Sequence, residues 1–575
     1  MSRFSVQRQK VAIDSPIAMG GLLGLWAVLT WLSFPGANLW PAAHLSLVPL
    51  AMLALRCTSV KRLSIFTYVA GVIWWIIGVA WLRGVTGGGY VAVAFYLGLY
   101  PLIFVWGLRL IGRRAHLPMV LAVPLVIVTL EYFRGWAMTG FPWFLLGQSQ
   151  PVSLIQIADV TGVYGVSFLV AMTSGLIVDL MLNPMIGRGG RLGGTVKWSM
   201  GLWFAAMVVA LVYGRWRVSQ LDGMTGAKLR IAVVQTNEPQ SNKNSPTEEQ
   251  EQLYFSKLLK LNEQAAVTKP GLIVWPETVV PRPINNEMVR VAMGYCQRLT
   301  EPVEDEAMRR SLQYWCAVVG YQRQVRQAAI DGGAYLIVGA GAHTDEQVGQ
   351  QMKRYNSAYC FSPNGSLIDR YDKVHRVPFG EYVPFDKDSW LHKLLLKLTP
   401  YDGFDYSLTP GSRYAVFDLT VQRDGKAERW RAAAPICFED VFPRECRRMV
   451  YDASGKRADV LVNLTNDGWY PDSAQASQHE QLARFRCVEN RVPMARAVNR
   501  GVSGVFDSAG RRIGMVMIAG QRQSISGVAT AEVMRDDRVT LFGRFGNVFA
   551  VMCGIVTVLL TAMSVLMPKI PGRGG

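Results

Sequence analysis

The stretch Arg431-Ala-Ala-Ala-Pro-Ile-Cys-Phe-Glu-Asp440 is a short apolar strand that ends at a cysteine. Cys437 follows Pro-Ile directly, and the carboxylates of Glu439 and Asp440 come next. A thiol at the end of a strand can act as a nucleophile when a neighbouring base deprotonates it. A cysteine after an apolar run is, however, more often a small buried hydrophobic residue. The rest of the sequence must therefore supply a base, an oxyanion stabiliser and a substrate.

The composition indicates a membrane protein with a globular part. The chain has 575 residues and a mean hydropathy of +0.17, which is too long for one domain and too apolar for an ordinary soluble protein. The net charge of +18 does not require nucleic acid as a partner, because cytoplasmic loops of membrane proteins collect Lys and Arg. The Cys and His residues show no zinc-ligand spacing, and there is no Walker-type loop. We therefore expect neither nucleic acid nor a metal.

Eight apolar segments are candidate membrane spans, since about 20 apolar residues cross a bilayer. They are Ile17–Phe34, Leu39–Leu55, Leu63–Leu82, Tyr90–Leu108, Leu117–Tyr132, Val163–Leu182, Trp198–Gly214 and Val548–Met567. The second and fifth are short. The first follows Arg3, Arg8 and Lys10, as in a signal peptide, but no clear small-residue cleavage site follows it. We therefore expect this helix to be retained.

The charges of the connecting loops predict the orientation of the chain. Basic residues gather in the N-terminal tail and in alternate loops, at Arg56, Lys61, Arg62, Arg109, Arg113, Arg114, Arg188, Arg191 and Lys197. The intervening loops carry only Arg83 and Arg134. The positive-inside rule then puts both termini in the cytoplasm. We expect a seven-helix transmembrane domain at 1–216, an extracytoplasmic globular domain at 217–545, and a last helix with a short cytoplasmic tail at 546–575.

Strands alternate with helices in the globular part, which predicts an α/β fold with helices covering the sheets. Strands are expected at Leu229–Val234, Leu272–Trp275, Ala334–Val338, Tyr355–Phe361, Leu367–Asp372, Val460–Leu464, Met494–Val498 and Val502–Phe506. Asn364-Gly365 is a strong hairpin signal between two of them. Helices are expected from an N-cap at Ser245 to about Ala266, up to Asp331, from about Pro443, and near Ser473–Arg491.

The segment Arg282–Gln322 is long and rich in charge, and we interpret it as an irregular insertion. It contains Cys296 and Cys316. In an oxidising compartment these two thiols could pair, but the sequence does not decide this.

Three predicted strands end at reactive residues: Glu277 after Leu-Ile-Val-Trp-Pro, Lys373 after Arg-Tyr-Asp, and Cys437. Taken singly, Glu277 could be a helix cap and Lys373 an ordinary surface cation. In this order the three residues resemble the Glu-Lys-Cys triad of the nitrilase (carbon–nitrogen hydrolase) superfamily. In that chemistry the carboxylate takes the thiol proton, the ammonium stabilises the oxyanion, and the thiolate forms a thioester.

Further motifs are similar to those of the bacterial apolipoprotein N-acyltransferases. They are Lys373-Val-His-Arg-Val-Pro-Phe-Gly-Glu-Tyr-Val-Pro384, Trp275-Pro-Glu277, Asn466-Asp-Gly-Trp469, Arg134-Gly-Trp-Ala-Met-Thr-Gly-Phe-Pro-Trp143 and Ala158-Asp-Val-Thr-Gly-Val-Tyr-Gly-Val-Ser167. The resemblance covers nearly the whole chain and implies a multi-span α-helical membrane domain joined to an α/β nitrilase-like domain, an α-β-β-α sandwich. Soluble nitrilases lack both the spans and the Val-Pro-Phe-Gly-Glu loop.

The resemblance also implies roles for individual residues. Glu277 would be the general base, Lys373 the oxyanion stabiliser and Cys437 the nucleophile. Supporting residues would be Glu381, Phe438, Glu439 and Trp469. Two features depart from the family: Phe438 stands where a Tyr is frequent, and the 282–322 insertion is longer than expected. No cofactor is implied.

The aromatic segment around Trp136, Phe141 and Trp143 has two interpretations. Aromatic residues are common at the membrane–water interface. The segment could also form part of a lipid access path on the side of the globular domain. Glu131 and Arg134 at its start could simply pair with each other.

The hypothesis is a two-step acyl transfer in the bacterial inner membrane, with the catalytic domain periplasmic. Cys437 would take an acyl chain from a phospholipid and pass it to the α-amine of a diacylglyceryl-cysteine apolipoprotein, with the enzyme acting as a monomer. One alternative is a membrane-tethered nitrilase that hydrolyses an amide. Another is a transporter or scaffold, but only Asp179 and Glu131 are acidic within the proposed spans, which is few for a polar-substrate pathway.

Overall fold

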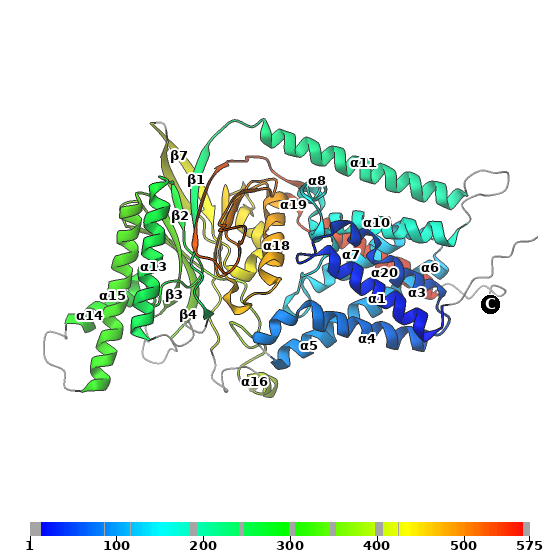
Figure 1. Ribbon diagram of the computed structural model, residues 1–575, viewed down its shortest axis with the longest axis horizontal. Helices are drawn as coiled ribbons and strands as arrows, with labels where there is room; N and C mark the ends of the chain where they lie inside the picture. The colour runs from blue at the N-terminus through cyan, green and yellow to red at the C-terminus, as the bar shows by residue number, and fades with distance from the viewer. Residues whose placement is uncertain are drawn as a thin grey trace, which may run out of the picture. The chain divides into compact units, whose positions relative to one another are not determined.

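The chain divides into two compact units in a computed structural model (Figure 1). The structure describes residues 13–85, 87–115, 117–183, 193–240, 247–297, 305–344, 352–396, 406–423 and 425–566. The helical unit comprises Met1–Arg83, Gly87–Arg215 and Asn547–Gly575, and the α/β unit comprises Gly84–Thr86 and Trp216–Gly546. Some residues used to predict the orientation lie outside the described residues. They are the basic residues of the N-terminal tail, the loop residues Arg188 and Arg191, and the expected C-terminal tail.

The helical unit contains helices with the length and composition of membrane spans. Within the described residues, six helices are long and apolar enough to cross a membrane. They are α1 (Pro16–Ser33), α4 (Val60–Gly78), the combined α5 (Gly87–Leu97) and α6 (Leu99–Arg114), α10 (Val163–Leu182), α11 (Gly194–Asp222) and α20 (Val548–Leu566). The expected fifth span is α7 (Met119–Arg134), a shorter helix of 16 residues.

The expected span Leu39–Leu55 is not one continuous helix. It forms three short helices, η1 (Trp40–Ala42), α2 (Ala43–Ser46) and α3 (Val48–Arg56). Pro41 and Pro49 each occupy the start of one of these pieces, because proline fits the first turn of a helix but breaks its interior.

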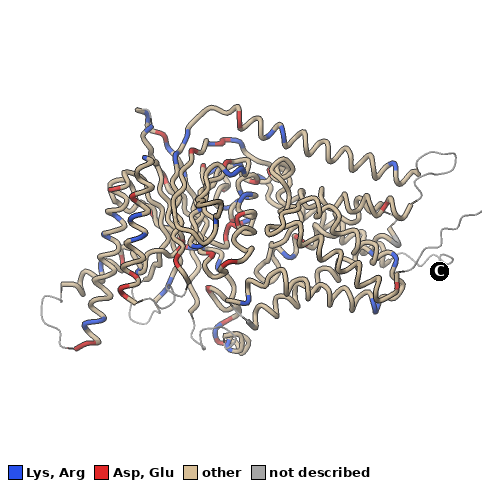
Figure 2. Tube along the Cα trace, viewed as in Figure 1, with Lys and Arg blue, Asp and Glu red and all other residues tan. Residues whose placement is uncertain are grey.

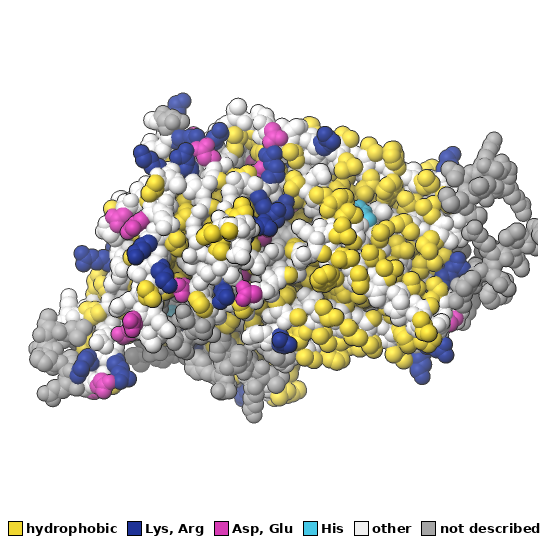
Figure 3. Space-filling view, in the orientation of Figure 1, with side chains coloured by type: hydrophobic (Ala, Val, Ile, Leu, Met, Phe, Trp, Pro, Cys, Tyr) yellow, Lys and Arg dark blue, Asp and Glu magenta, His cyan; other side chains and the backbone are white. Residues whose placement is uncertain are grey.

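The surface of the helical unit is apolar. Figure 3 shows hydrophobic side chains over most of its visible face, and Figure 2 shows few charged residues along its helices. On α11, the side chains of Trp198, Phe204 and Val209 are 78%, 63% and 65% exposed. Exposed apolar area of this extent is unusual for a protein surface in water and suits contact with lipid.

The α/β unit contains two six-stranded sheets and a small two-stranded one. The first sheet has the order β14 (Gly527–Met534), β1 (Lys228–Gln235), β2 (Leu272–Val274), β3 (Tyr335–His343), β4 (Arg354–Phe361), β5 (Leu367–Asp372). The second has the order β13 (Arg512–Met515), β12 (Gly504–Phe506), β11 (Met494–Asn499), β10 (Val460–Asn466), β7 (Lys426–Ala433), β6 (Phe417–Arg423). Each has a parallel centre, β1-β2-β3 and β7-β10-β11, flanked by antiparallel strands.

Alternating residues of the strands build two cores. In β1, Leu229, Ile231 and Val233 belong to the core that includes Trp430 and the rest of the second sheet. Ala232 and Val234 face the other way, toward α13 (Glu248–Val267) and α15 (Glu306–Gly332). Helices α17 (Pro443–Val450) and α18 (Gln475–Asn490) follow strands of the second sheet, and Figure 1 shows α13 and α15 on one side of the sheets and α18 on the other. The α/β unit is therefore an α-β-β-α sandwich, as predicted.

The described part of the expected insertion is largely helical, so the prediction of an irregular segment was wrong. Helix α14 (Asn286–Cys296) packs on α15 through Met288, Val289 and Ala292. Their spacing of three and four residues is the helical one. Residues 298–304 lie outside the described residues.

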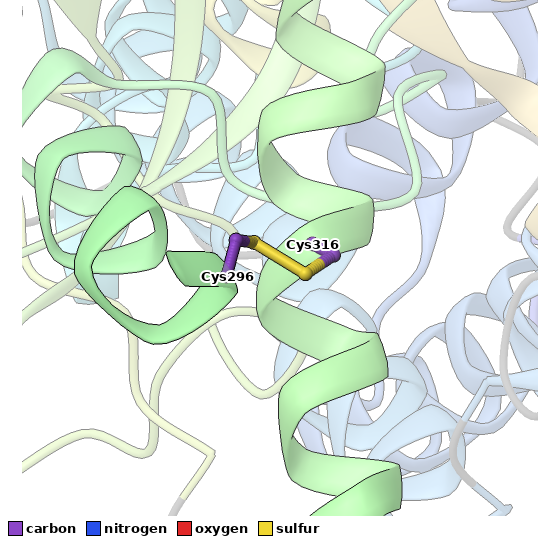
Figure 4. Close-up of a disulfide and its surroundings, with 2 residues drawn as sticks. All are labelled: Cys296 and Cys316. Atoms are coloured by element: carbon purple, nitrogen blue, oxygen red, sulfur yellow. A yellow bond between two sulfur atoms is a disulfide. The ribbon is translucent and has the colours of Figure 1, made fainter. Parts of the chain in front are cut away.

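Two details of the sequence analysis are resolved around these helices. Cys296 at the end of α14 forms a disulfide with Cys316 in α15, as Figure 4 shows. The N-cap of α13 is Thr247, whose side chain accepts a hydrogen bond from the N–H of Gln250. The cap expected at Ser245 lies outside the described residues.

Candidate active site

Glu277 follows β2, at the point where the chain leaves the first sheet. Gly339 of β3 lies directly against this turn. A Cβ atom at Gly339 would be 2.6 Å from both the Cα of Glu277 and the carbonyl oxygen of Pro276, closer than real Cβ contacts occur. The side chain of Glu277 is 8% exposed. Close packing of the turn on a glycine therefore fixes where this carboxylate emerges.

Lys373 follows β5 and ends between two carboxylates. Its Nζ lies 2.9 Å from Oε1 of Glu381 and 3.6 Å from Oε1 of Glu277, and its side chain is 1% exposed. Burial by itself would lower the pKa of Lys373, but Glu381 and Glu277 outweigh it and raise the pKa above its usual value. The ammonium group therefore stays charged.

Asn356 of β4 joins the same two carboxylates. Its Nδ2 donates to Oε1 of Glu277 (2.7 Å) and to Oε1 of Glu381 (2.9 Å). The second oxygen of Glu381 accepts from the backbone N–H of Val377 (2.8 Å). Because one amide donates both bonds, it fixes the two carboxylates relative to each other. The Lys373 ammonium is therefore the only cation needed between them.

Cys437 lies at a sharp turn after β7, at the start of the short 3₁₀ helix η6 (Cys437–Val441). Ile436 still pairs with Leu464 in a parallel bridge, and Cys437 then takes a φ of 50°, which is costly for a residue with a side chain and is common at functional sites. Burial raises the pKa of the Cys437 thiol well above its usual value, the charge of Glu277 raises it further, and Lys373 opposes them. The resting thiol is therefore protonated and needs a base.

Glu439 connects the turn at Cys437 with the segment after Lys373. It is fully buried. Its two oxygens accept four hydrogen bonds, from the Tyr371 hydroxyl (2.7 Å) and the backbone N–H groups of Val374 (2.9 Å), His375 (2.9 Å) and Ile436 (2.8 Å). Burial raises the pKa of Glu439 to about 7, although the hydrogen bonds act against the shift. With its lone pairs engaged in this way, Glu439 is suited to holding the two segments together.

Phe438 and Trp469 lie in the two loops that follow β7 and β10. The Phe438 ring packs edge-on against Phe442, with 5.0 Å between ring centroids. Trp469 ends η7 (Asp467–Trp469) and is partly exposed. For the next residue, Tyr470, burial raises the pKa of the phenol, and the negative charge of a Cys437 thiolate raises it further, so the phenol lies within electrostatic reach of the sulfur.

The three aromatic residues expected to form a lipid access path differ in exposure. Trp136 is 55% exposed and Phe141 is partly buried, whereas Trp143 is 2% exposed. The Trp143 ring stacks on Phe141 at 6.2 Å and packs against Trp81 at 5.2 Å between centroids. Of the three, Trp136 has the surface that a lipid chain could contact directly.

Glu131 and Arg134, at the end of α7, bond to the backbone of this aromatic segment. Nη2 of Arg134 donates to the carbonyl of Trp143 (2.8 Å). Oε1 of Glu131 accepts from the N–H of Leu146 (2.7 Å). The two residues thus hold the non-helical loop, whose backbone groups would otherwise lack partners in an apolar environment.

Asn356 and Tyr470 were missed by the sequence analysis. Asn356 is the second residue of a predicted strand and is followed by the polar Ser357, so nothing in the local sequence distinguishes it. Tyr470 follows the Asn466-Asp-Gly-Trp469 motif and has no distinguishing spacing of its own.

The arrangement combines a protonated thiol, a carboxylate and a permanent cation. Such a set can attack a carbonyl and stabilise the resulting oxyanion. Among the residues that the structure describes, no group of three or more His, Cys, Asp or Glu is arranged to hold a metal ion.

Comparisons with known proteins cover both units. The family model of the apolipoprotein N-acyltransferase N-terminal domain matches residues 26–176, and the carbon-nitrogen hydrolase model matches residues 230–539. An apolipoprotein N-acyltransferase of Geobacter metallireducens is 32% identical over 94% of each chain. One of Vibrio cholerae is 27% identical over 84% of this chain and 86% of that one. Among solved structures, a mutant amidase of Nesterenkonia is 15% identical, with a TM-score of 0.34 over 56% of this chain and 94% of that chain.

Proposed function

The chain belongs to the apolipoprotein N-acyltransferases, and we propose that it transfers its acyl group through a thioester on Cys437, with Glu277 as the general base and Lys373 as the oxyanion stabiliser. The observation that carries these roles is the position of the Lys373 ammonium between Glu277 and Glu381, with the charges of Glu277 and Lys373 both acting on the thiol.

In the first half-reaction, a membrane phospholipid is the acyl donor. Glu277 accepts the thiol proton as the sulfur of Cys437 forms a bond to the ester carbonyl carbon. The oxyanion that develops is stabilised by Lys373. The carbon–oxygen bond of the ester then breaks, and Glu277 returns the proton to the leaving alkoxide. The products are the acyl-enzyme and a lysophospholipid.

In the second half-reaction, the acceptor is the α-amine of a diacylglyceryl-cysteine apolipoprotein. The neutral amine attacks the thioester carbonyl, a carbon–nitrogen bond forms, and the carbon–sulfur bond breaks. Glu277 takes the proton that the amine nitrogen loses and passes it to the thiolate. The protonated thiol of Cys437 is thus restored, and no cofactor enters the balance.

The supporting residues have roles consistent with their contacts. Asn356 and Glu381 hold the base and the ammonium in fixed positions. Asn356 donates to Glu277 (2.7 Å) and to Glu381 (2.9 Å), and the Lys373 ammonium donates to Glu381 (2.9 Å). Glu439 fixes the turn at Cys437. Phe438 and Trp469 contribute apolar surface for the acyl chain, which also protects a thioester from water, and Trp136 contributes to lipid access.

The enzyme is a membrane protein, and we further propose that it acts as a monomer in the inner membrane with the α/β unit periplasmic and both termini cytoplasmic. The basic residues of alternate loops support this orientation. The Cys296–Cys316 disulfide supports it independently, because disulfides persist in oxidising compartments. The ester of an outer-leaflet phospholipid and the N-terminus of an exported lipoprotein are both available on that side.

The decisive experiment is intact-mass analysis of the purified enzyme after mixing with phospholipid vesicles of one defined acyl chain. The wild type should gain the mass of one acyl group, and Cys437→Ala should gain none. Cys446→Ala is the matched control, because Cys446 is a fully buried free thiol of α17 and should leave the adduct unchanged. An unmodified wild type, or an equal adduct on Cys437→Ala, would refute the proposal. Release of ammonia from an amide without any lipid would favour a hydrolase instead.

A further inference from the structure

Four buried charged side chains lie next to the turn at Cys437 and take no part in the proposed proton transfers. They are Asp440 of η6, Asp467 of η7, His479 of α18 and Arg496 of β11. None is more than 2% exposed. They come from four different elements, so their interactions tie together parts of the α/β unit that are far apart in the sequence.

The four side chains form a closed ring in which cations and anions alternate. His479 contacts Oδ1 of Asp440 through Nε2 (2.7 Å) and Oδ1 of Asp467 through Nδ1 (2.9 Å). Arg496 donates to the other oxygen of each carboxylate, to Oδ2 of Asp440 at 2.7 Å and to Oδ2 of Asp467 at 3.2 Å. Each aspartate therefore bridges the same two cationic side chains.

The hydrogen-bond donors and acceptors of the four side chains determine the charge of His479. A neutral imidazole has one N–H and one acceptor nitrogen, whereas an ionised carboxylate oxygen only accepts. Both ring nitrogens of His479 face carboxylate oxygens. When both carboxylates are ionised, as their bonds to Arg496 favour, both nitrogens donate and the ring is an imidazolium. With Arg496 always charged, the ring then holds two positive and two negative charges.

The other groups around His479 agree with this charge state. Burial and Arg496 lower the pKa of His479, but Asp440 and Asp467 raise it above its usual value. On its own helix, Gln475 donates to Asp467 (3.1 Å). Glu480, the next residue, is directed to Arg512 instead (2.7 Å).

The ring reaches Cys437 along two routes. Asp440 lies three residues after Cys437 in η6. Arg496 also donates to Oδ1 of Asn463 (2.7 Å), and the amide of Asn463 donates to the carbonyls of Pro435 (3.2 Å) and Cys437 (3.5 Å). The backbone on both sides of the thiol is thus attached to the ring.

Asp467 extends the ring to the loop that carries Trp469. The carbonyl of Asp467 accepts a hydrogen bond from the N–H of Tyr470 (3.0 Å), the residue whose phenol is within electrostatic reach of Cys437. His479 is the member of the ring that joins this loop to the turn of the nucleophile and that can lose its charge.

We propose that His479 is a positioning residue, held as an imidazolium, which locks the turn of Cys437 to the loop of Trp469 and Tyr470 and so keeps the thiol aligned with Glu277 and Lys373. The inference rests on the proposed role of Cys437 as the nucleophile. Because His479 does not touch the substrate, its loss should slow thioester formation without weakening lipid binding.

The first test reads the charge of His479 directly. ¹⁵N-histidine-labelled enzyme in detergent is followed by NMR while the pH is raised past 6.5, the ordinary histidine value. One imidazolium signal with both nitrogens protonated should persist, and it should be absent from His479→Gln. If that variant does not fold, replacing the other five of the 6 His residues assigns the signal by elimination. A His479 that becomes neutral with an ordinary pKa overturns the proposal.

The second test separates positioning from general stability. In single-turnover experiments with phospholipid vesicles, His479→Gln should lower the maximal rate of thioester formation at least about tenfold and leave the half-saturating lipid concentration within about twofold. Glu480→Gln, which removes the ion pair between the buried Glu480 of the same helix and the exposed Arg512, should retain the wild-type rate within about threefold. Asp440→Asn is the second variant if His479→Gln does not fold, and the same split is expected.

The outcomes distinguish this inference from the proposed function. A wild-type rate in His479→Gln, or an equal loss in Glu480→Gln, overturns the positioning role while the thioester mechanism stands. A wild type that forms no adduct refutes Cys437 as the nucleophile, and the positioning role falls with it even if the imidazolium signal is present.

Discussion

Replacing Asn356 by alanine tests whether one amide holds the base in place. Asn356 is 6% exposed and donates to Glu277 at 2.7 Å and to Glu381 at 2.9 Å. Both acceptors are carboxylates, so both bonds are of the strong, charge-assisted kind. Glu381 keeps the Lys373 ammonium and the Val377 N–H as partners after the substitution. For Glu277 the bond from Asn356 at 2.7 Å is shorter than the contact with the ammonium at 3.6 Å, so we expect the base to be the group most affected.

The expected size of the effect follows from the bond to Glu277. A hydrogen bond to a charged group contributes about 1.5–3 kcal/mol. We expect the substitution to raise the activation free energy of thioester formation by this amount, because the bond orients Glu277 in the transition state. Since about 1.36 kcal/mol of activation free energy corresponds to a tenfold change in rate, the rate of thioester formation should fall about 10- to 150-fold. The phospholipid concentration for half-maximal rate should change little, since Asn356 holds the base rather than the acyl chain.

The assay is rapid-quench intact-mass analysis of the acyl-enzyme, with thermal unfolding measured in parallel. Ser357→Ala is the matched control, because Ser357 is the next residue of β4, is fully buried and donates to Asp372 rather than to the carboxylates of the site. It should retain the wild-type rate within about threefold. A rate for Asn356→Ala within threefold of the wild type would refute the idea that this amide positions Glu277.

Three other substitutions give distinct outcomes. Gly339→Ala would place a Cβ 2.6 Å from the Cα of Glu277, so it should destabilise the fold by about 1–3 kcal/mol and slow thioester formation, as thermal unfolding and the mass assay would report. Cys296→Ser with Cys316→Ser removes a disulfide across a separation of 20 residues and should cost about 3 kcal/mol of stability in the chain-entropy model with acylation retained; a non-reducing peptide map checks the bond itself. Burial raises the pKa of Glu439 from 4.5 to about 7 in the folded protein. Its contribution to folding stability is therefore full below pH 4.5 and is lost as the pH rises to about 7. Glu439→Gln should abolish this pH dependence of the thermal unfolding temperature.

The patterns in the sequence predict the centres of the two sheets and one edge strand, β5, but not the other three edge strands. Strands such as Leu272–Val274 and Val460–Asn466 are buried on both faces. The first strand and residues 460–462 of the second therefore appear as continuous apolar runs. The strands β6, β13 and β14 were not predicted. All three lie at the edges of the sheets and are only partly buried, so none of them appears as a continuous apolar run.

The same distinction applies to the site. Glu277, Lys373 and Cys437 follow strands that the apolar pattern predicts, so their position at strand ends could be inferred from sequence. Asn356 could not, because its partners lie 79 and 25 residues away in the chain and only the pairing of β4 with β3 and β5 brings it to them. Residues that act through contacts between distant segments leave no local pattern.

The two acidic residues of the predicted spans, Asp179 and Glu131, have structural roles in the helical unit. Asp179 of α10 accepts hydrogen bonds from the N–H groups of Met119 (2.9 Å) and Val120 (3.0 Å) and from the Ser199 hydroxyl (2.7 Å). It thereby caps the first turn of α7, whose N–H groups have no partner within the helix.

Glu131, at the other end of α7, accepts the N–H of Leu146 in the aromatic loop. Both carboxylates therefore satisfy backbone donors that lipid could not satisfy. A pathway for a polar substrate needs ionisable groups that are available to bind the substrate, whereas each of these two carboxylates accepts backbone N–H groups near one end of α7. The acidic residues of the helical unit thus stabilise its own backbone, which disagrees with the transporter alternative.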